Sequence, residues 1–538
     1  MQKPDANAAQ SQPNWITRLL NTVEWLGNLL PHPVTLFALL ALGILLVSGL
    51  LGWMGVSVPD PRPEGTEGRA LDGMIRVISL LDPEGLRRIV TNLVTNFTGF
   101  VPLGTVLVAM LGVGIAERSG LLTAAIKLLV LGAPKNLVTV VVVFAAIVSN
   151  TASEMGYVVV IPLAAAIFHA LGRHPLAGLA AAFAGVSGGY SANLLIGTVD
   201  PLLAGITQEA ADLIHPGYEV HAAVNWYFMI ASTFVVTAMG WFVTAKIVEP
   251  KLGPYDPAGL DESAEAISME PVSGRERRAL AWAGLAAGAV GLAIALLVVP
   301  SGGWLRLPGA PDTLASLRPF LTGVVVVVAV FFAIPGIVYG ALTGTFRNDR
   351  DVIDAMAKSM STMGLYIVLV FFAAQFVAFF NWTQLGQVVA VVGSNSLQAI
   401  GLTGPLVFLA FIMICALINL SLGSASAQWA VTAPIFVPML MLIGYSPEVI
   451  QAAYRIGDSV TNIITPMMSY FGLILAFAAR YQKDIGVGTL IAMMLPYSVV
   501  FFIGWTALFF LWVFGLGLPV GPGAQRLGES VETFGVLA

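Results

Sequence analysis

The chain has 538 residues, of which 57% are hydrophobic and only 10% are charged. Soluble domains carry about 25% charged residues, so this composition excludes a soluble globular protein. Apolar segments of roughly membrane-spanning length recur along the whole chain, which indicates a polytopic membrane protein. The formal net charge of −5 says little about orientation, because topology follows the placement of Lys and Arg.

The N-terminal half contains one hydrophobic segment that is interrupted in the middle. We expect residues 1–31 to form a polar tail and an interfacial amphipathic helix, and residues 32–248 to form the first transmembrane half. Within it, LVTVVVVFAAIV runs into SNTASE and resumes as MGYVVVIPLAAAIF. Each arm is shorter than the ~20 residues that a spanning helix needs. The pattern predicts a re-entrant helical hairpin over about residues 137–170, with its tip near Asn150.

The segments after this hairpin combine an apolar run with glycine breaks. Leu176–Asn193 is apolar as far as Gly185, where the glycines predict an unwound span. We expect Asp200-Pro201 to end this unit, Leu203–Asn225 to be loop-like, and Trp226–Val248 to span the membrane.

The second half repeats this plan after a hydrophilic linker at 249–278. We expect the C-terminal transmembrane half over 279–517, with a second hairpin at about 405–443, and a tail over 518–538. Placing the linker and the basic loop after residue 342 in the cytoplasm leaves residues 301–320 outside.

A short sequence frame occurs in both halves. Gly172-Arg-His-Pro175, nine residues and Gly185-Val-Ser187 match Gly444-Tyr-Ser-Pro447, nine residues and Gly457-Asp-Ser459. Each frame follows a Ser-rich break. Paired interrupted hydrophobic segments are the best sequence indication of a secondary-transporter site. The sequence therefore predicts two structurally repeated, inverted halves.

The first break and the segment after it carry oxygen-bearing side chains. Hydroxyl, amide and freed carbonyl oxygens suit a hard cation such as Na⁺ or a polar substrate group. Alternatively, these residues only cap two short helices, and Asp200 only caps the helix before Pro201. The candidates for ion or substrate binding in this half are Ser149, Asn150, Thr151, Ser153, Asn193, Gly197 and Asp200.

The second candidate site follows a run with no Asp, Glu, Lys or Arg between Lys358 and Glu448. Arg455, Asp458 and Asn462 then fall on one helical face. Ionisable groups inside a membrane are expensive and indicate function. We interpret Asp458 as a cation-binding or protonated group and Arg455 as the holder of an anionic substrate group. The alternative is an internal Arg455–Asp458 salt bridge.

Trp429 lies beside the second Ser-rich break, near Ser426. There it is either a stacking surface for a substrate ring or an ordinary packing residue.

Other function classes lack their motifs. There is no P-loop for ATP and no HExxH zinc motif. The histidines supply no nucleophile–base or metal set for an enzyme. A passive channel would need rings of charged residues or filter repeats, and the sequence shows neither. No nucleic-acid partner is expected.

Three long motifs resemble the AbgT family, the p-aminobenzoyl-glutamate transporters. They are SNTASEMGYVVVIPLAAAIF, GVSGGYSANLLIGTVDPLLAGIT and SASAQWAVTAPIFVPM followed by YRIGDSVTNIITPMMSY. The resemblance covers essentially the whole chain. It implies an all-α homodimer in the bacterial inner membrane, with about nine transmembrane helices and two re-entrant hairpins per protomer.

The resemblance also implies transport of p-aminobenzoyl-glutamate or export of sulfonamide antimetabolites, coupled to Na⁺ or to protons and without another cofactor. The substrate is then a small anionic aromatic compound. A Na⁺-coupled dicarboxylate symporter of the same superfamily is the alternative. Asn419 and Asp458 correspond to the cation position of the family. The other functional positions that the motifs carry over are Asp200, Ser426, Trp429, Pro447, Arg455 and Pro466.

Overall fold

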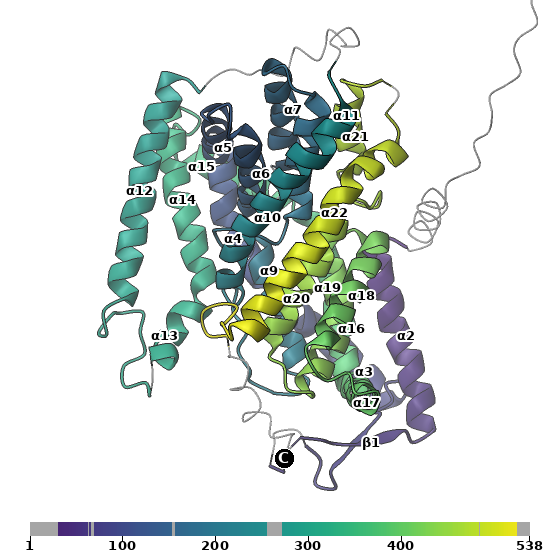
Figure 1. Ribbon diagram of the computed structural model, residues 1–538. Coiled ribbons are helices and arrows are strands. Elements are labelled where there is room, and N and C mark those ends of the chain that lie inside the picture. The colour runs from purple at the N-terminus through teal and green to yellow at the C-terminus, as the bar shows by residue number, and fades with distance from the viewer. Residues whose placement is uncertain are drawn as a thin grey trace, which may run out of the picture.

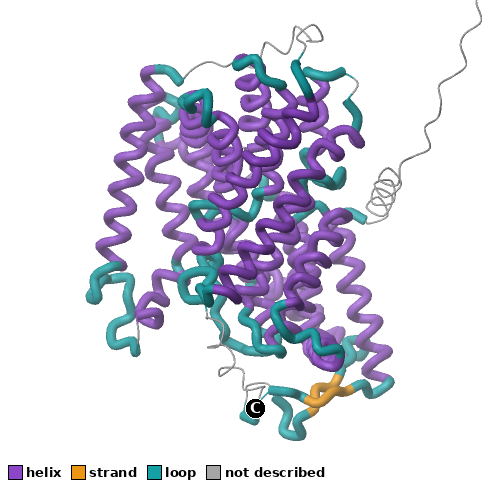
Figure 2. The backbone as a smooth tube through the Cα atoms, viewed as in Figure 1, coloured by secondary structure: helices purple, strands orange, loops and turns teal. Residues whose placement is uncertain are grey.

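The computed structural model describes residues 31–62, 64–65, 69–152, 156–255, 272–311, 313–483 and 485–524. Almost all of its regular structure is helical (Figures 1 and 2). Over these ranges, the only strands are β1 (Ser57–Pro59) and β2 (Met74–Arg76), an antiparallel pair at one end of the molecule. The predicted interfacial helix, the middle of the linker, Ser153 and most of the C-terminal tail lie outside the described residues.

Among the described residues, seven helical segments are long and apolar enough to cross a membrane. These segments are α2 (Pro33–Trp53), α3 with α4 (Pro83–Thr98 and Val101–Arg118), α10 with η4 and α11 (Trp226–Val243, Thr244–Val248 and Glu249–Leu252), α12 (Gly274–Val298), α14 (Val324–Thr343), α16 (Gly364–Trp382), and α22 with η7 (Val487–Phe509 and Phe510–Gly515). The chain is therefore an all-α polytopic membrane protein, as the sequence predicts.

The remaining helices are shorter. They are α5 (Leu121–Leu131), α6 (Val138–Ser149), η1 (Asn150–Ala152), η2 (Gly156–Val160), α7 (Ile161–Ala170), α8 (Pro175–Phe183), η3 (Ala184–Gly188), α9 (Val199–Ala211), α13 (Thr313–Thr322), α15 (Asp349–Ser361), α17 (Leu385–Ala399), α18 (Leu406–Leu422), α19 (Ala425–Met441), α20 (Pro447–Thr461) and α21 (Phe471–Ala479).

The long helices α12, α14 and α4 pack side by side at one edge, on the left of Figure 1. Gly112 of α4 lies so close to α14 that an added Cβ atom would overlap the carbonyl oxygen of Ala329. Small residues allow such close helix contacts where lipid gives no hydrophobic driving force. At the opposite edge α2 packs against α16, and the interrupted helices lie between the two edges.

Both predicted breaks are present. α6 ends at Ser149 and leads through η1 towards η2 and α7. α18 ends at Leu422, Gly423 adopts a left-handed φ of 57°, and α19 begins at Ala425. Such a φ favours glycine, which explains why the second break falls there. The depth of these hairpins in the membrane stays a prediction.

The repeated sequence frame has the same local structure in both halves. Gly172 and Gly444 both have positive φ, 71° and 97°. Pro175 and Pro447 then start α8 and α20 at the first helical position, where proline is favoured because its missing N–H is not needed.

The second glycine of each frame contacts the preceding hairpin helix in the same way. An added Cβ atom on Gly185 would lie 2.6 Å from the Cβ of Ala146 in α6. On Gly457 it would lie 2.6 Å from the Cβ of Cys415 in α18. The frame therefore marks a real structural repeat, in which a broken helix packs closely on a hairpin arm.

Two sequence-based expectations are wrong. Much of the segment from Leu203 to Asn225 is helical, since α9 covers Val199–Ala211. Asp200-Pro201 starts this helix instead of ending a unit, because proline fits the first turn of a helix. The predicted external segment 301–320 contains most of α13, a short helix with an internal Pro319, and its position outside the membrane stays a prediction.

Candidate functional site

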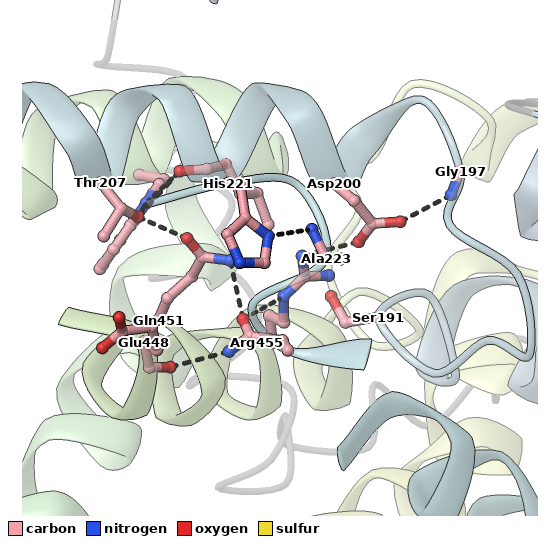
Figure 3. Close-up of polar contacts among 12 residues, drawn as sticks. Ser191, Gly197, Asp200, Thr207, His221, Ala223, Glu448, Gln451 and Arg455 are labelled. Carbon is pink, nitrogen blue, oxygen red and sulfur yellow. Dashed lines mark hydrogen bonds and ion pairs between the residues drawn. The ribbon is translucent and has the colours of Figure 1, made fainter. Parts of the chain in front are cut away.

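A buried ion pair joins the two halves of the chain. The Arg455 guanidinium on α20 donates from Nη2 to Oδ1 of Asp200 in the first turn of α9, over 2.7 Å, and both side chains are at most 4% exposed (Figure 3). The second Asp200 oxygen accepts the main-chain N–H of Gly197 over 2.6 Å. Separating a buried pair typically costs about 3–5 kcal/mol, so this contact fixes α20 against α9.

The alternative interpretation, an internal Arg455–Asp458 salt bridge, is therefore not what the described residues form. Over the described residues, the ion pair of Arg455 is the one with Asp200. The spacing of three along α20 places the two residues near each other at their backbones. It does not decide where a long guanidinium side chain points.

Neutral polar side chains continue the network from Arg455. Its Nε donates to Oδ1 of Asn225 over 3.0 Å, and the same oxygen accepts from the Gln451 amide over 2.7 Å. Thr207 of α9 donates to the side-chain Oε1 of Gln451 over 2.6 Å. The indole N–H of Trp429 donates to Thr207 over 2.9 Å. The network thus connects α9, α19 and α20 through buried hydrogen bonds.

Trp429 is not a free stacking surface here. Its side chain is fully buried, and its ring stacks on Tyr454 with centroids 4.2 Å apart and an interplanar angle of 25°. The hydroxyl of Tyr454 donates to the carbonyl oxygen of Ala425, at the start of α19, over 2.6 Å. Trp429 therefore packs behind the second hairpin in this structure, which agrees with the packing alternative for this residue.

A second polar cluster lies where α18 meets the end of α20. The Asn419 amide donates to the main-chain oxygen of Asp458 over 2.6 Å, to Thr461 Oγ1 over 3.0 Å and to Asn462 Oδ1 over 2.8 Å. Asn462 in turn donates to the main-chain oxygen of Ser187 over 3.4 Å. The structure thus brings Asn419, Asp458 and Asn462 together, as the family resemblance implies for Asn419 and Asp458.

Several buried oxygens in this cluster have no hydrogen-bond partner among the described residues. Both carboxylate oxygens of Asp458 are of this kind, as is Oδ1 of Asn419. Asp458 is 0% exposed and forms no ion pair within the described part of the chain. An ionised carboxylate in such a place is costly unless a cation or a proton neutralises it. The donor set fits a hard cation such as Na⁺, which prefers oxygen ligands.

The first break lies against the loop that carries Gly197. An added Cβ atom on Gly197 would lie 3.3 Å from the carbonyl oxygen of Asn150. Thr151 donates to Oδ1 of Asn193 over 2.9 Å, and both polar atoms of the buried Asn150 side chain have no partner among the described residues. Asn150, Thr151, Asn193 and Gly197 therefore meet at one place, near Asp200.

The other predicted site residues lie in different surroundings. Ser149 donates to the Ala146 carbonyl oxygen over 2.6 Å, as a helix-end hydroxyl does. Ser426 is half-buried in the first turn of α19, and Pro447 is buried as the first residue of α20. Pro466 follows the turn after α20. Ser153 lies outside the described residues.

Sequence reasoning did not identify Asn225, Gln451, Thr207 and Tyr454 as members of the network. Gln451 lies four residues before Arg455, so a search for neutral polar residues on the face of the charged helix would have found it. Asn225 and Thr207 come from other elements, and their contacts leave no sequence pattern.

Comparisons with known proteins match this chain to one family of transporters over nearly its full length. The model of the AbgT putative transporter family matches residues 18–527. The p-aminobenzoyl-glutamate transport protein of Escherichia coli (strain K12) is 38% identical over 506 residues, which are 94% of this chain and 96% of that protein.

Two solved structures have the same fold. Neisseria gonorrhoeae MtrF, described as one of a class of antimetabolite efflux pumps, is 62% identical with a TM-score of 0.89, and the match covers 94% of this chain and 100% of that chain. The Alcanivorax borkumensis YdaH transporter is 47% identical with a TM-score of 0.84, over 91% of this chain and 100% of that chain. The chain therefore belongs to the AbgT family of membrane transporters.

Proposed function

We propose that this transporter moves small aromatic carboxylates, with p-aminobenzoyl-glutamate as the representative substrate, and exports sulfonamide antimetabolites across the bacterial inner membrane. A Na⁺ or proton gradient drives the transport. The observation that carries this proposal is the buried Asp200–Arg455 pair, which places an always-charged guanidinium between the two repeated halves. The E. coli relative and MtrF support this choice of substrates.

Arg455 serves as the anion-binding group in this proposal. In the described arrangement Asp200 and Asn225 occupy its Nη2 and Nε atoms. A substrate carboxylate that reaches Arg455 competes with Asp200 for the guanidinium. Substrate binding then weakens a contact between α9 and α20, which couples occupancy to the relative position of the halves.

Asp458 serves as the coupling residue. Its unpaired, buried carboxylate needs a cation or a proton. With Na⁺ bound, the residues that would hold the ion are Asp458, Asn419 and Asn462 on one side of the repeat. On the other side, Ser149 and Asn150 of the first break and Gly197 of the loop against it would contribute oxygen atoms.

A binding experiment on the purified protein tests the proposal. Titration with p-aminobenzoyl-glutamate and with a sulfonamide, in NaCl and in choline chloride at two pH values, measures affinity and its dependence on the ion. We expect both compounds to bind, and one of the two cations to strengthen their binding. Binding of neither compound under any of these conditions contradicts the proposal. Tight binding of an aliphatic dicarboxylate instead would favour the dicarboxylate symporter.

A further inference from the structure

A small aromatic pocket lies between the two halves, beside the second break. It encloses about 190 Å³. Tyr157 comes from η2 after the first break, Tyr190 follows η3, and Tyr470 precedes α21. Ser424 and Ser426 line it from the second break. Both halves of the repeat therefore contribute to one cavity.

Two of these tyrosines face each other in parallel. The rings of Tyr157 and Tyr470 have centroids 4.6 Å apart and an interplanar angle of 5°. Flat aromatic faces of this kind stack favourably on another ring. Tyr157 is 5% exposed and Tyr470 is half-buried, so the pair forms a largely buried wall of the pocket.

The size and chemistry of the pocket suit one substituted ring. Pockets for whole drug-sized ligands enclose about 300–1,000 Å³, so this pocket is large enough for only a part of such a ligand. Its described lining contains no Asp, Glu, Lys, Arg or His, whereas serine hydroxyls and Asn462 provide neutral polar contacts. A ring with an amino group matches this lining, whereas a carboxylate finds no cationic partner in it.

The pocket adjoins the predicted cation cluster and the support formed by Trp429. Asn462 lines the pocket and also accepts a hydrogen bond from Asn419 over 2.8 Å. Ala425 lines the pocket as well, and its carbonyl oxygen accepts the hydroxyl of Tyr454, the ring that covers Trp429. Trp429 thus lies one layer behind the wall of the pocket.

We infer that Tyr157, Tyr190 and Tyr470 form the subsite for the aniline ring of the transported compounds, and that Trp429 does not contact this ring. The inference rests on the proposed function, because p-aminobenzoyl-glutamate and sulfonamides share that ring. The glutamate carboxylates then lie outside this pocket, where a cation such as Arg455 can reach them.

A ligand series tests the inference by calorimetry on the purified full-length protein. The ligands are p-aminobenzoyl-glutamate and N-acetylglutamate, which share the glutamate and differ in the ring. We expect Tyr470→Leu to weaken p-aminobenzoyl-glutamate by about three- to tenfold, the size of one aromatic contact, and to leave N-acetylglutamate unchanged. Tyr470→Phe keeps the ring and should stay within about twofold of the wild type.

The control for this series is Tyr366→Leu. Tyr366 lies on α16 and donates to the Pro102 carbonyl oxygen, away from the pocket. We expect this control to bind both ligands as the wild type does. Equal losses of both ligands in Tyr470→Leu, or no loss of either while the wild type binds, overturn the inference and leave the proposed function standing. If the wild type does not bind p-aminobenzoyl-glutamate at all, the proposed function fails together with the inference.

A labelling experiment remains informative if Tyr470→Leu does not fold. The only cysteine, Cys415, is buried, so Ser426→Cys provides a single reactive thiol in the pocket lining. We expect p-aminobenzoyl-glutamate and p-aminobenzoate to slow its reaction with a maleimide, and N-acetylglutamate to have no effect. Protection by N-acetylglutamate, or by none of the three at concentrations that saturate p-aminobenzoyl-glutamate binding, overturns the inference.

Discussion

Arg455 and Asp200 are 255 positions apart in the chain and form a 2.7 Å ion pair in the interior. Arg455 lies on α20 in the C-terminal half, and Asp200 lies on α9 in the N-terminal half. The pair therefore links the two halves. Its guanidinium is also the only fixed positive charge in the described network.

A double-mutant cycle separates these two roles. We expect Asp200→Asn and Arg455→Gln each to lower the free energy of unfolding by about 3–5 kcal/mol, since each leaves one buried charge unpaired. The double variant removes both charges and should regain most of that stability, yet bind no carboxylated substrate. Chemical unfolding in detergent and ligand titration measure the two effects.

The exposed Arg76–Asp72 pair is the matched control for this cycle. Its side chains are 57% and 49% exposed. We expect Asp72→Asn to change the free energy of unfolding by less than about 1 kcal/mol. If the double variant of the buried pair loses as much free energy of unfolding as the two single variants together, Asp200 and Arg455 do not stabilise the fold as a pair.

Asp458→Asn tests the coupling residue. Both carboxylate oxygens have no hydrogen-bond partner among the described residues, so the isosteric change should leave the protein folded. If Na⁺ binds here, NaCl raises the unfolding temperature of the wild type by mass action and does not do so in the variant. If a proton binds instead, substrate binding loses its pH dependence in the variant.

Glu448→Gln is the control for Asp458→Asn. Glu448 is also a buried carboxylate on α20, but its Oε1 accepts the hydroxyl of Tyr218 over 2.8 Å. We expect this variant to keep the ion dependence of the wild type. If Asp458→Asn keeps both its sodium response and its pH dependence, Asp458 is not the coupling residue.

The two equivalent glycines provide a stability prediction. We expect Gly185→Ala and Gly457→Ala to lower the free energy of unfolding by similar amounts, about 1–3 kcal/mol each, because the added methyl group overlaps a hairpin arm. Gly284→Ala on α12 has no atom within 4 Å of the added methyl and should be neutral or stabilising. Thermal unfolding of the three variants measures this, and an unaffected Gly457→Ala would argue against close packing of the repeat.

Sequence reasoning predicted those parts of the structure that depend on neighbours along the chain. The breaks at Ser149–Ala152 and Gly423 follow from short apolar arms and helix-breaking residues. The two frames follow from glycine and proline, whose backbone preferences are strong and local. The joint location of Asn419, Asp458 and Asn462 came from the family resemblance.

The contacts between distant elements were not predictable in the same way. Periodicity along α20 identified Asp458 as a neighbour of Arg455, but the guanidinium reaches Asp200 on α9 instead. Trp429 lies beside a break in the sequence, and only the packing of Tyr454 reveals that its ring is covered. The direction and burial of a side chain depend on the whole fold, and the local pattern of a single sequence does not determine them.

His174 provides a pH-dependent test outside the membrane-spanning segments. It caps α8, where its Nδ1 accepts the Leu176 N–H over 3.3 Å. Burial lowers the pKa of His174, and the nearby Glu249 only partly opposes this. The folded protein therefore binds fewer protons than the unfolded chain, whose histidine pKa is about 6.5. This contribution to stability is complete above pH ~6.5 and is lost as the pH falls towards the lowered pKa.

His174→Asn is the matching variant, because asparagine keeps a capping oxygen and does not titrate. We expect the unfolding temperature of the wild type to fall further between pH 8 and pH 5 than that of the variant. Equal falls in the two proteins would show that His174 does not contribute to the acid sensitivity.

The most direct test of coupled transport is accumulation of p-aminobenzoyl-glutamate in proteoliposomes with an imposed gradient of Na⁺ or of pH, for the wild type and Asp458→Asn. We expect the wild type to move the substrate against its own concentration gradient in one orientation of one of the two gradients, and Asp458→Asn to lose this accumulation. A wild-type protein that only equilibrates the substrate under every gradient, or an Asp458→Asn variant that still accumulates it, would contradict the account.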